Sequence, residues 1–376
     1  MNILAIETSC DDTCCAILEI KNKKIKILSN IVSSQVKIHQ PYGGVYPFLA
    51  KREHQRNLAP ILKKALVEAR LLNSKFKSQN SKLQFKILNS VKNIDLIAVT
   101  NGPGLEPCLW TGINFAKELS EKLKLPLVPV NHIEAHIFAN FVGSSSKFKS
   151  QKSKSQFKIQ NLFPAICLIV SGGHTQLILI KGLGKYKILG ETRDDAAGEC
   201  LDKIARILGL GYPGGPLIAK LAKKTSKVQS SKFKVSLPRP MINQKNYDFS
   251  FSGLKTAVLY LVKQLTQNDR KLKTEQKIKI AAEAQQSIID VLLHKTLKAA
   301  KEYQAKTIIL GGGVAANDEL RKQFKIQGSK LKINFLVPPK NYCTDNAVMA
   351  ALTAYYYRLK NKKEIGGISA DANLKL

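Results

Sequence analysis

The chain has 376 residues, 44% of them hydrophobic, which is enough for two compact domains that each bury a core. The first residues, MNILAIETSCDD, contain no basic stretch before an apolar run, and no window holds about 18 uninterrupted apolar residues. The seven cysteines are scattered without a CxxC pair, which disfavours a zinc ribbon and indicates reduced thiols. We therefore expect a cytoplasmic protein that makes no membrane contact.

About half of the net charge of +33 lies in low-complexity repeats. Residues 74–87 and 146–159 are identical at 12 of 14 positions, and 226–235 and 322–333 are weaker copies of them. Together the four segments hold 16 lysines and no acidic residue. We interpret them as solvated inserts in surface loops rather than as RNA-binding arms. The remaining charge of +17 still favours a polyanionic partner.

The first half of the chain predicts strands and helices in alternation. Apolar runs at 2–7 and 14–20 flank a polar turn at 8–13, which predicts a strand, a turn and a strand. The small hydroxyls and backbone amides of that turn are suited to holding a phosphate. The elements predicted next are a helix over 54–72, a buried strand over 94–100, a helix after the glycine turn that follows it, and a short strand over 125–130 that leads into a helix.

The same pattern starts again at 165–182, where AICLIVSGGHTQLILIKG predicts a strand, a glycine turn and a strand. Two comparable units predict a duplicated α/β architecture with a cleft between its halves. Residues 306–324 predict a strand, a glycine-rich turn and a helix with Asn317 at a capping position, and a last helix is predicted over 346–359.

The segment NHIEAH places His132 and His136 four residues apart, so that both imidazoles lie on one helix face and can ligate one metal ion. An isolated HxxxH pair is more often a plain surface pair, but a helix that directly follows a buried strand points into a cleft. Glu134 lies roughly 200° round the helix from each histidine. This position differs from the HExxH pattern, so a metalloprotease is disfavoured.

A two-histidine site needs a carboxylate, and the best candidate is Asp345 in YCTDN. An equally good reading makes Asp345 the N-cap of the last helix. The turns SGGHT at 171–175, GYPGGP at 211–216 and GGGVAAN at 311–317 offer glycine backbone to a nucleotide, and only the last is more than an ordinary loop pattern.

Nine motifs in one order carry a family resemblance: IETSCDD, YGGVYPFLAKREH, GPGL, NHIEAH, LIVSGGHTQL, DDAAGECLDKIARILGLGYPGGP, FSFSGLKTA, GGGVAAN and CTDN. The chain resembles the TsaD/Gcp family of tRNA threonylcarbamoyladenosine synthesis proteins over nearly its whole length, apart from the lysine repeats. The resemblance implies an actin-like, Hsp70-like ATPase (ASKHA) fold of two lobes. We place the first lobe at 1–131, completed by 346–376, and the second at 132–345.

The resemblance also implies a reaction and its site residues. The threonylcarbamoyl group would pass from threonylcarbamoyl-AMP to the exocyclic amine of adenosine 37, just 3′ of the anticodon, in tRNAs that read ANN codons. Asp11 matches a catalytic position near the reacting group. The positions that match metal ligands, for Fe²⁺ or alternatively Zn²⁺, are His132, His136 and Asp345. The positions that match adenylate-binding residues are Ile169, Val170, Ser171, Gly172, Gly173, Asp202, Gly215 and Asn317.

The partners implied are tRNA, the inactive paralogue TsaB and the small P-loop ATPase TsaE. Two alternative functions share this fold. A small-molecule O-carbamoyltransferase would need a further large domain, which 376 residues do not accommodate. The non-catalytic paralogue scaffold lacks the HxxxH pair and the CTDN motif, both of which are present here.

Overall fold

The computed structural model describes residues 1–22, 24–72, 93–142, 159–228, 233–267, 271–359 and 367–376. The chain divides into two compact units, which we call the first unit (Met1–Ser155 with Thr344–Leu376) and the second unit (Gln156–Cys343). The lysine repeat at 74–87, and all but the last residue of the repeat at 146–159, lie outside the described residues.

The sheet of the first unit has the strand order β3-β2-β1-β4-β5. Its two antiparallel pairs join β1 to β2 and β2 to β3, while β4 and β5 extend the sheet in parallel. The strands are β1 (Asn2–Glu7), β2 (Asp12–Lys21), β3 (Lys24–Ser34), β4 (Leu96–Gly102) and β5 (Leu127–Asn131). Because β1 and β2 are both buried, the turn between them is held at the centre of this sheet.

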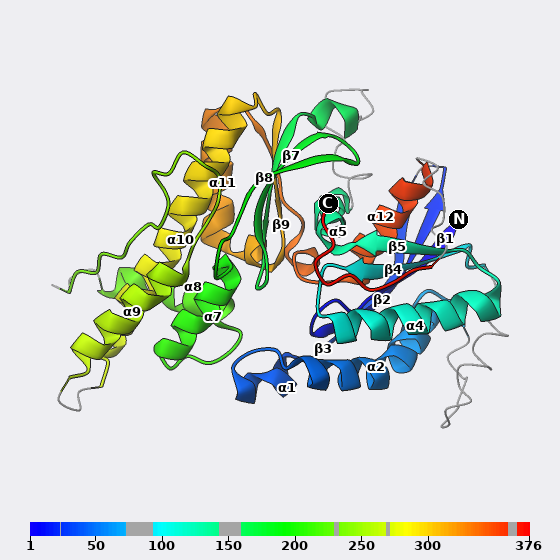
Figure 1. The fold of residues 1–376 in the computed structure, drawn as a ribbon, viewed down its shortest axis with the longest axis horizontal. Helices are drawn as coiled ribbons and strands as arrows, with labels where there is room; N and C mark the ends of the chain where they lie inside the picture. The colour runs from blue at the N-terminus through cyan, green and yellow to red at the C-terminus, as the bar shows by residue number, and fades with distance from the viewer. Residues whose placement is uncertain (23, 73–92, 143–158, 229–232, 268–270, 360–366) are drawn as a thin grey trace. The chain divides into compact units, whose positions relative to one another are not determined.

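Helices cover both faces of this sheet (Figure 1). The amphipathic helices α2 (Pro47–Glu68) and α4 (Glu106–Leu123) pack on one face against Leu4, Ile6 and Ile17. The helix α12 (Ala347–Leu359) packs against β1 and β2 and also against α5 (His132–Phe138). The short helix α1 (Val36–His39) follows β3.

The second unit repeats the same sheet, with the strand order β10-β9-β6-β7-β8. Its strands are β6 (Ala165–Val170), β7 (Thr175–Gly182), β8 (Lys185–Glu191), β9 (Thr307–Gly311) and β10 (Asn334–Leu336). Its helices are α7 (Ala197–Ile207), α8 (Gly214–Ala222), α9 (Ser252–Leu265), α10 (Thr274–Glu302) and α11 (Asp318–Lys330). Two antiparallel pairs and two parallel pairs occur in the same order in both units, which confirms the predicted duplicated α/β architecture.

Two sequence predictions differ from the structure. We predicted a lobe boundary at 131/132, whereas α5 groups with the first unit, because it packs against β5 and α12. The proposed insert at 322–333 is wrong: α11 extends to Lys330, and Phe324 is fully buried in the core of the second unit. Lysines at helical spacing cover the solvent side of this helix while their apolar neighbours pack inward.

No helix among the described residues is both long and apolar enough to cross a membrane.

Candidate active site

The helix α5 begins where strand β5 ends, and Asn131 makes the transition. Its side-chain oxygen accepts a hydrogen bond from the backbone N–H of Glu134 at 3.0 Å, which is the normal role of an N-cap residue. One helical turn then brings the rings of His132 and His136 edge to face, with centroids 4.6 Å apart at 81°. Both imidazoles are buried. The predicted shared face of the pair is therefore present.

Asp345 completes a three-residue group with the two histidines. Its Oδ1 atom lies 3.6 Å from Nε2 of His132 and 3.2 Å from Nε2 of His136. The alternative role as N-cap of α12 belongs to Asn346 instead, whose side chain accepts from the backbone N–H of Met349 at 3.2 Å. Asp345 thus lies with the histidines, as the metal-site reading predicted.

The geometry of this group fits a divalent metal ion. One ligand atom from each of the three residues lies within 4.8 Å of the others. Ligands at the usual distance of about 2.1 Å in a tetrahedral arrangement are about 3.4 Å apart, close to both separations that involve Asp345. Among the described residues, neither ring nitrogen of His136 has a hydrogen-bond partner of good geometry, although both are buried. A buried nitrogen of this kind is costly unless something else binds it.

Behind the group, the buried carboxylate of Glu7 orients His132. Glu7 accepts hydrogen bonds from the backbone N–H of Ser9 at 2.5 Å and from Oγ1 of Thr100 at 2.5 Å, and its Oε2 lies 3.2 Å from Nδ1 of His132. Burial alone would raise the pKa of Glu7, but the charge of His132 and the hydrogen bonds from His132 and Ser9 lower it instead. A carboxylate on Nδ1 orients the ring so that Nε2 faces Asp345, where it can ligate a metal ion.

The carboxylates around His132 favour its protonated form. Burial lowers the pKa of this imidazole, but the carboxylates of Asp345 and Glu7 raise it further, to about 9. A metal ion that binds Nε2 therefore displaces a proton.

Asp11 lies in the turn between β1 and β2, in the same unit as the three ligands. Burial and the charge of Asp345 raise its pKa. Its neighbour Asp12 was missed by the sequence prediction, although burial raises its pKa further, to about 7. The signal for it was present: an acidic residue that directly enters an apolar strand has a carboxyl at the edge of a core.

Glu134 takes no part in this group. Its carboxylate accepts a hydrogen bond from the hydroxyl of Tyr357 in α12. This contact agrees with the helical geometry that argued against a metalloprotease.

In the second unit, the predicted phosphate turn joins β6 to β7. Ile169 and Val170 are fully buried strand residues, so any contact that they make with a ligand uses their backbone. Ser171 closes the turn: its N–H donates to the carbonyl of His174 at 2.8 Å, and its hydroxyl accepts from the N–H of His174 at 3.1 Å. Gly172 lies at the exposed tip.

Glycine is required where other segments meet this turn. A Cβ on Gly198, in the first turn of α7, would lie 2.5 Å from the carbonyl oxygen of Ser171. A Cβ on Gly312 would lie 2.4 Å from the carbonyl oxygen of Val170, and its φ of +86° also favours glycine. At Gly172 and Gly173 a Cβ would meet nothing within 4 Å, so space is open beside the tip.

Asp202 and Gly215 both lie where α7 packs against α8. The Asp202 carboxylate accepts a hydrogen bond from the backbone N–H of Gly214 at 2.6 Å, at the first residue of α8. A Cβ on Gly215 would lie 3.8 Å from Leu201. The resemblance to the family pointed to Asp202, whereas residue patterns alone did not.

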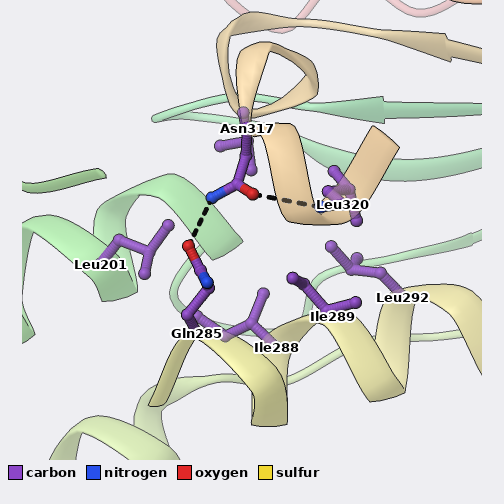
Figure 2. A pocket seen from close by; sticks show the side chains of 8 residues that line it. Leu201, Gln285, Ile288, Ile289, Leu292, Asn317 and Leu320 are labelled. Carbon is purple, nitrogen blue, oxygen red and sulfur yellow. Dashed lines mark hydrogen bonds between the residues drawn. The ribbon is translucent and has the colours of Figure 1, made fainter. Parts of the chain in front are cut away.

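Asn317 borders a small pocket in the second unit (Figure 2). Its side-chain oxygen accepts from the N–H groups of Glu319 at 3.0 Å and Leu320 at 3.1 Å, and its amide donates to Gln285 at 2.8 Å. The predicted capping role is thus confirmed. The pocket is lined by Leu201, Gln285, Ile288, Ile289, Leu292, Val314, Asn317 and Leu320.

Comparisons with known proteins identify the family. The family model "TsaD: tRNA N6-adenosine threonylcarbamoyltransferase" matches residues 26–78 and 81–352. Proteins named tRNA N6-adenosine threonylcarbamoyltransferase from Thermosipho africanus and Thermodesulfovibrio yellowstonii are 44% and 45% identical over 376 residues, covering 100% of each chain. A solved structure of full-length HypF, in its phosphate- and nucleotide-bound form, has a TM-score of 0.53 at 11% identity and covers 98% of this chain and 56% of that one.

The similarity to HypF concerns the fold alone, and with the duplicated sheets it supports the expected ASKHA class. The family match and the full-length relatives decide the classification. The chain belongs to the TsaD family of tRNA N6-adenosine threonylcarbamoyltransferases.

Proposed function

We propose that this protein transfers the threonylcarbamoyl group from threonylcarbamoyl-AMP to the exocyclic amine of adenosine 37 in tRNAs that read ANN codons. The observation that carries the proposal is the group formed by His132, His136 and Asp345, in the same unit as Asp11, in a chain of this family. The cytoplasm is the proposed location, with TsaB and TsaE as the proposed partner proteins.

The donor is a mixed anhydride and is already activated, whereas the adenine amine is a weak nucleophile. In the step proposed, the amine nitrogen forms a bond to the carbamoyl carbon, the bond from that carbon to the phosphate oxygen breaks, and AMP leaves. The amine loses one proton. Positioning of the reactants and stabilisation of charge therefore account for most of the rate enhancement.

In the first unit, His132, His136 and Asp345 would hold one divalent ion, for which we propose Fe²⁺, with Zn²⁺ as the second choice. When bound, such an ion supplies positive charge that polarises the carbamoyl carbonyl. Asp11 would orient the amine or accept its proton, and its pKa, raised by burial, suits a proton acceptor better than an ordinary aspartate.

In the second unit, the backbone around Ser171, Gly172 and Gly173 would hold the phosphate of the leaving AMP, since the tip of this turn is open. Asn317 would lie beside the adenosine of the leaving AMP, next to the aliphatic residues of the small pocket that it borders. Gly215 would lie near the same adenosine, since a Cβ on it would be 3.8 Å from Leu201, which lines that pocket, and Asp202 holds the start of α8 beside it. The net charge of +33 would attract the tRNA backbone, and a loop base can be splayed out to react.

The test is to incubate the protein with TsaB, TsaE, tRNA, threonine, bicarbonate, ATP and the enzyme that makes the adenylate, and to quantify the modified nucleoside. We expect the nucleoside only in ANN-reading tRNAs, and a loss of more than about 100-fold for His132→Ala with His136→Ala. The matched control is His294→Ala, an exposed histidine in α10. No product from the wild-type protein, or a fully active double variant, would refute the proposal.

A further inference from the structure

A chain of buried side chains in the first unit connects the N-terminus of α2 to the turn that carries Asp11. It runs from Tyr46 through His39, Gln35 and His54 to Cys10. The side chains of His39, Gln35 and His54 are completely buried. None of the three belongs to the candidate metal group.

Both ends of this chain have fixed roles. The backbone N–H of Tyr46 must donate, so Nδ1 of His39, at 3.3 Å, is the acceptor. The carbonyl of Cys10 must accept, so Nε2 of His54, at 2.9 Å, carries the proton. Nδ1 of His54 is then an acceptor and receives the hydroxyl of Thr13 at 2.8 Å.

Gln35 joins the two histidines in only one orientation. Its amide nitrogen lies 3.4 Å from the carbonyl of Ala50, which can only accept, and 3.4 Å from Nδ1 of His54. Its amide oxygen therefore receives Nε2–H of His39, at 3.1 Å. The bonds from Tyr46 to His39, from His39 to Gln35 and from His54 to Cys10 point one way, with both imidazoles neutral. The single lone pair on Nδ1 of His54 is shared by Thr13, its closer donor at 2.8 Å, and Gln35 at 3.4 Å. Burial lowers the pKa of His54, which supports the neutral form.

The two carbonyls that flank Asp11 are both held by this network. His54 donates to the carbonyl of Cys10, in the peptide before Asp11. The backbone N–H of Gln35 donates to the carbonyl of Asp11 itself at 3.0 Å. Two anchors on consecutive peptide groups leave little freedom for the Cα–Cβ bond of the residue between them.

We propose that His54 is a positioning residue: as a neutral Nε2–H imidazole it fixes the peptide before Asp11 and so aims the Asp11 carboxylate at the reacting amine. The proposal rests on the role given to Asp11 under the proposed function. His54 itself touches no reacting atom.

Two isosteric variants test it. His54→Gln places its amide N–H near the position of Nε2 and restores kcat to within about threefold of wild type, whereas His54→Asn places its donor at the Nδ1 end and loses the bond to Cys10. We expect His54→Asn to lower kcat about 10- to 100-fold and to change KM for tRNA by no more than about twofold, because only the aim of Asp11 changes. His294→Asn is the matched control.

Two readouts do not depend on the reaction. Nitrogen NMR of the imidazoles should show His54 as the neutral Nε2–H tautomer at pH 7.5. Cys10 is partly exposed, whereas the other six cysteines are buried. Burial and the charge of Asp11 raise the pKa of its thiol, so labelling by N-ethylmaleimide is slow while the turn is closed and reports on its opening. We expect labelling to be about fivefold faster in His54→Asn and unchanged in His54→Gln.

The outcomes separate the two proposals. If the wild-type protein makes no modified nucleoside, the proposed function fails, while the NMR and labelling results still decide whether His54 holds the turn. A protonated or Nδ1–H His54, an unchanged kcat in His54→Asn, or an equal loss in both variants with intact thermal unfolding would overturn the positioning role.

Discussion

Replacing Glu7 by glutamine should weaken metal binding without any change in the three ligands. The carboxylate accepts from Ser9, Thr100 and His132, and all of these groups are donors. A glutamine amide can present oxygen to only one side, so its NH₂ group must face a donor whichever way it is turned. Facing His132, the NH₂ group would favour the tautomer that is protonated at Nε2, the nitrogen required for the metal.

The expected loss of metal affinity can be estimated from other carboxylates that hydrogen-bond a metal-ligating histidine. Loss of such a partner typically costs 10- to 100-fold in metal affinity, or about 1.4 to 2.7 kcal/mol. The measurement is competition for Zn²⁺ against a chelator at fixed pH, with thermal unfolding of the metal-free proteins to check that the variant folds. Glu106→Gln, at an exposed position in the first turn of α4, is the control with the same chemical change. An affinity for Zn²⁺ equal to that of wild type would refute the orienting role of Glu7.

Three further changes test other parts of the structure. In the folded protein the pKa of Asp12 is raised to about 7, so the contribution of this residue to the free energy of unfolding falls as the pH rises from about 4 to 7. Asp12→Asn should remove this pH dependence. In metal-free protein at pH 7.5 it should raise the free energy of unfolding, measured with urea, by about 1 to 2 kcal/mol. Asn317→Ala removes the N-cap of α11 and should lower the free energy of unfolding by about 1 to 2 kcal/mol in the same assay. Asn317→Asp keeps a capping oxygen and should retain most of the wild-type stability. An unchanged urea midpoint in Asn317→Ala would contradict the capping role. Gly198→Ala forces a Cβ against the Ser171 carbonyl and should lower stability by about 1 to 3 kcal/mol, whereas Gly173→Ala, with open space, should not; equal effects would mean that the close approach is unimportant.

The candidate metal group was predictable in part from local spacing. His132 and His136 lie one helical turn apart, and the strand before them made the start of the helix predictable. Asp345 is more than 200 residues away along the chain, and sequence alone left it equally suited to capping α12. Only the packing of α12 against α5 brings the carboxylate to the histidines.

Glu7 and His54 were not predicted for a different reason. Glu7 ends an apolar strand and His54 lies in an amphipathic helix, so each has the local pattern of an ordinary structural residue. Their roles depend on partners 125 and 44 residues away, His132 and Cys10. The reverse error occurred at 322–333, where a lysine-rich composition suggested a loop although Phe324 has the position of a core residue in a helix.

Under the proposed function, the two duplicated turns would divide the chemistry between them. The turn between β1 and β2 and the turn between β6 and β7 occupy equivalent places in the two sheets. In the first, Asp11 and Asp12 have raised pKa values and the backbone is held by buried side chains, which suits the handling of a proton. In the second, Gly172 and Gly173 leave the backbone open, which suits a phosphate. A carboxylate at the second turn would repel the phosphate of AMP, so Gly172→Asp should weaken AMP binding. Gly172→Ala adds no charge and should have little effect. Equal affinities for AMP in the two variants would mean that the turn does not hold the phosphate.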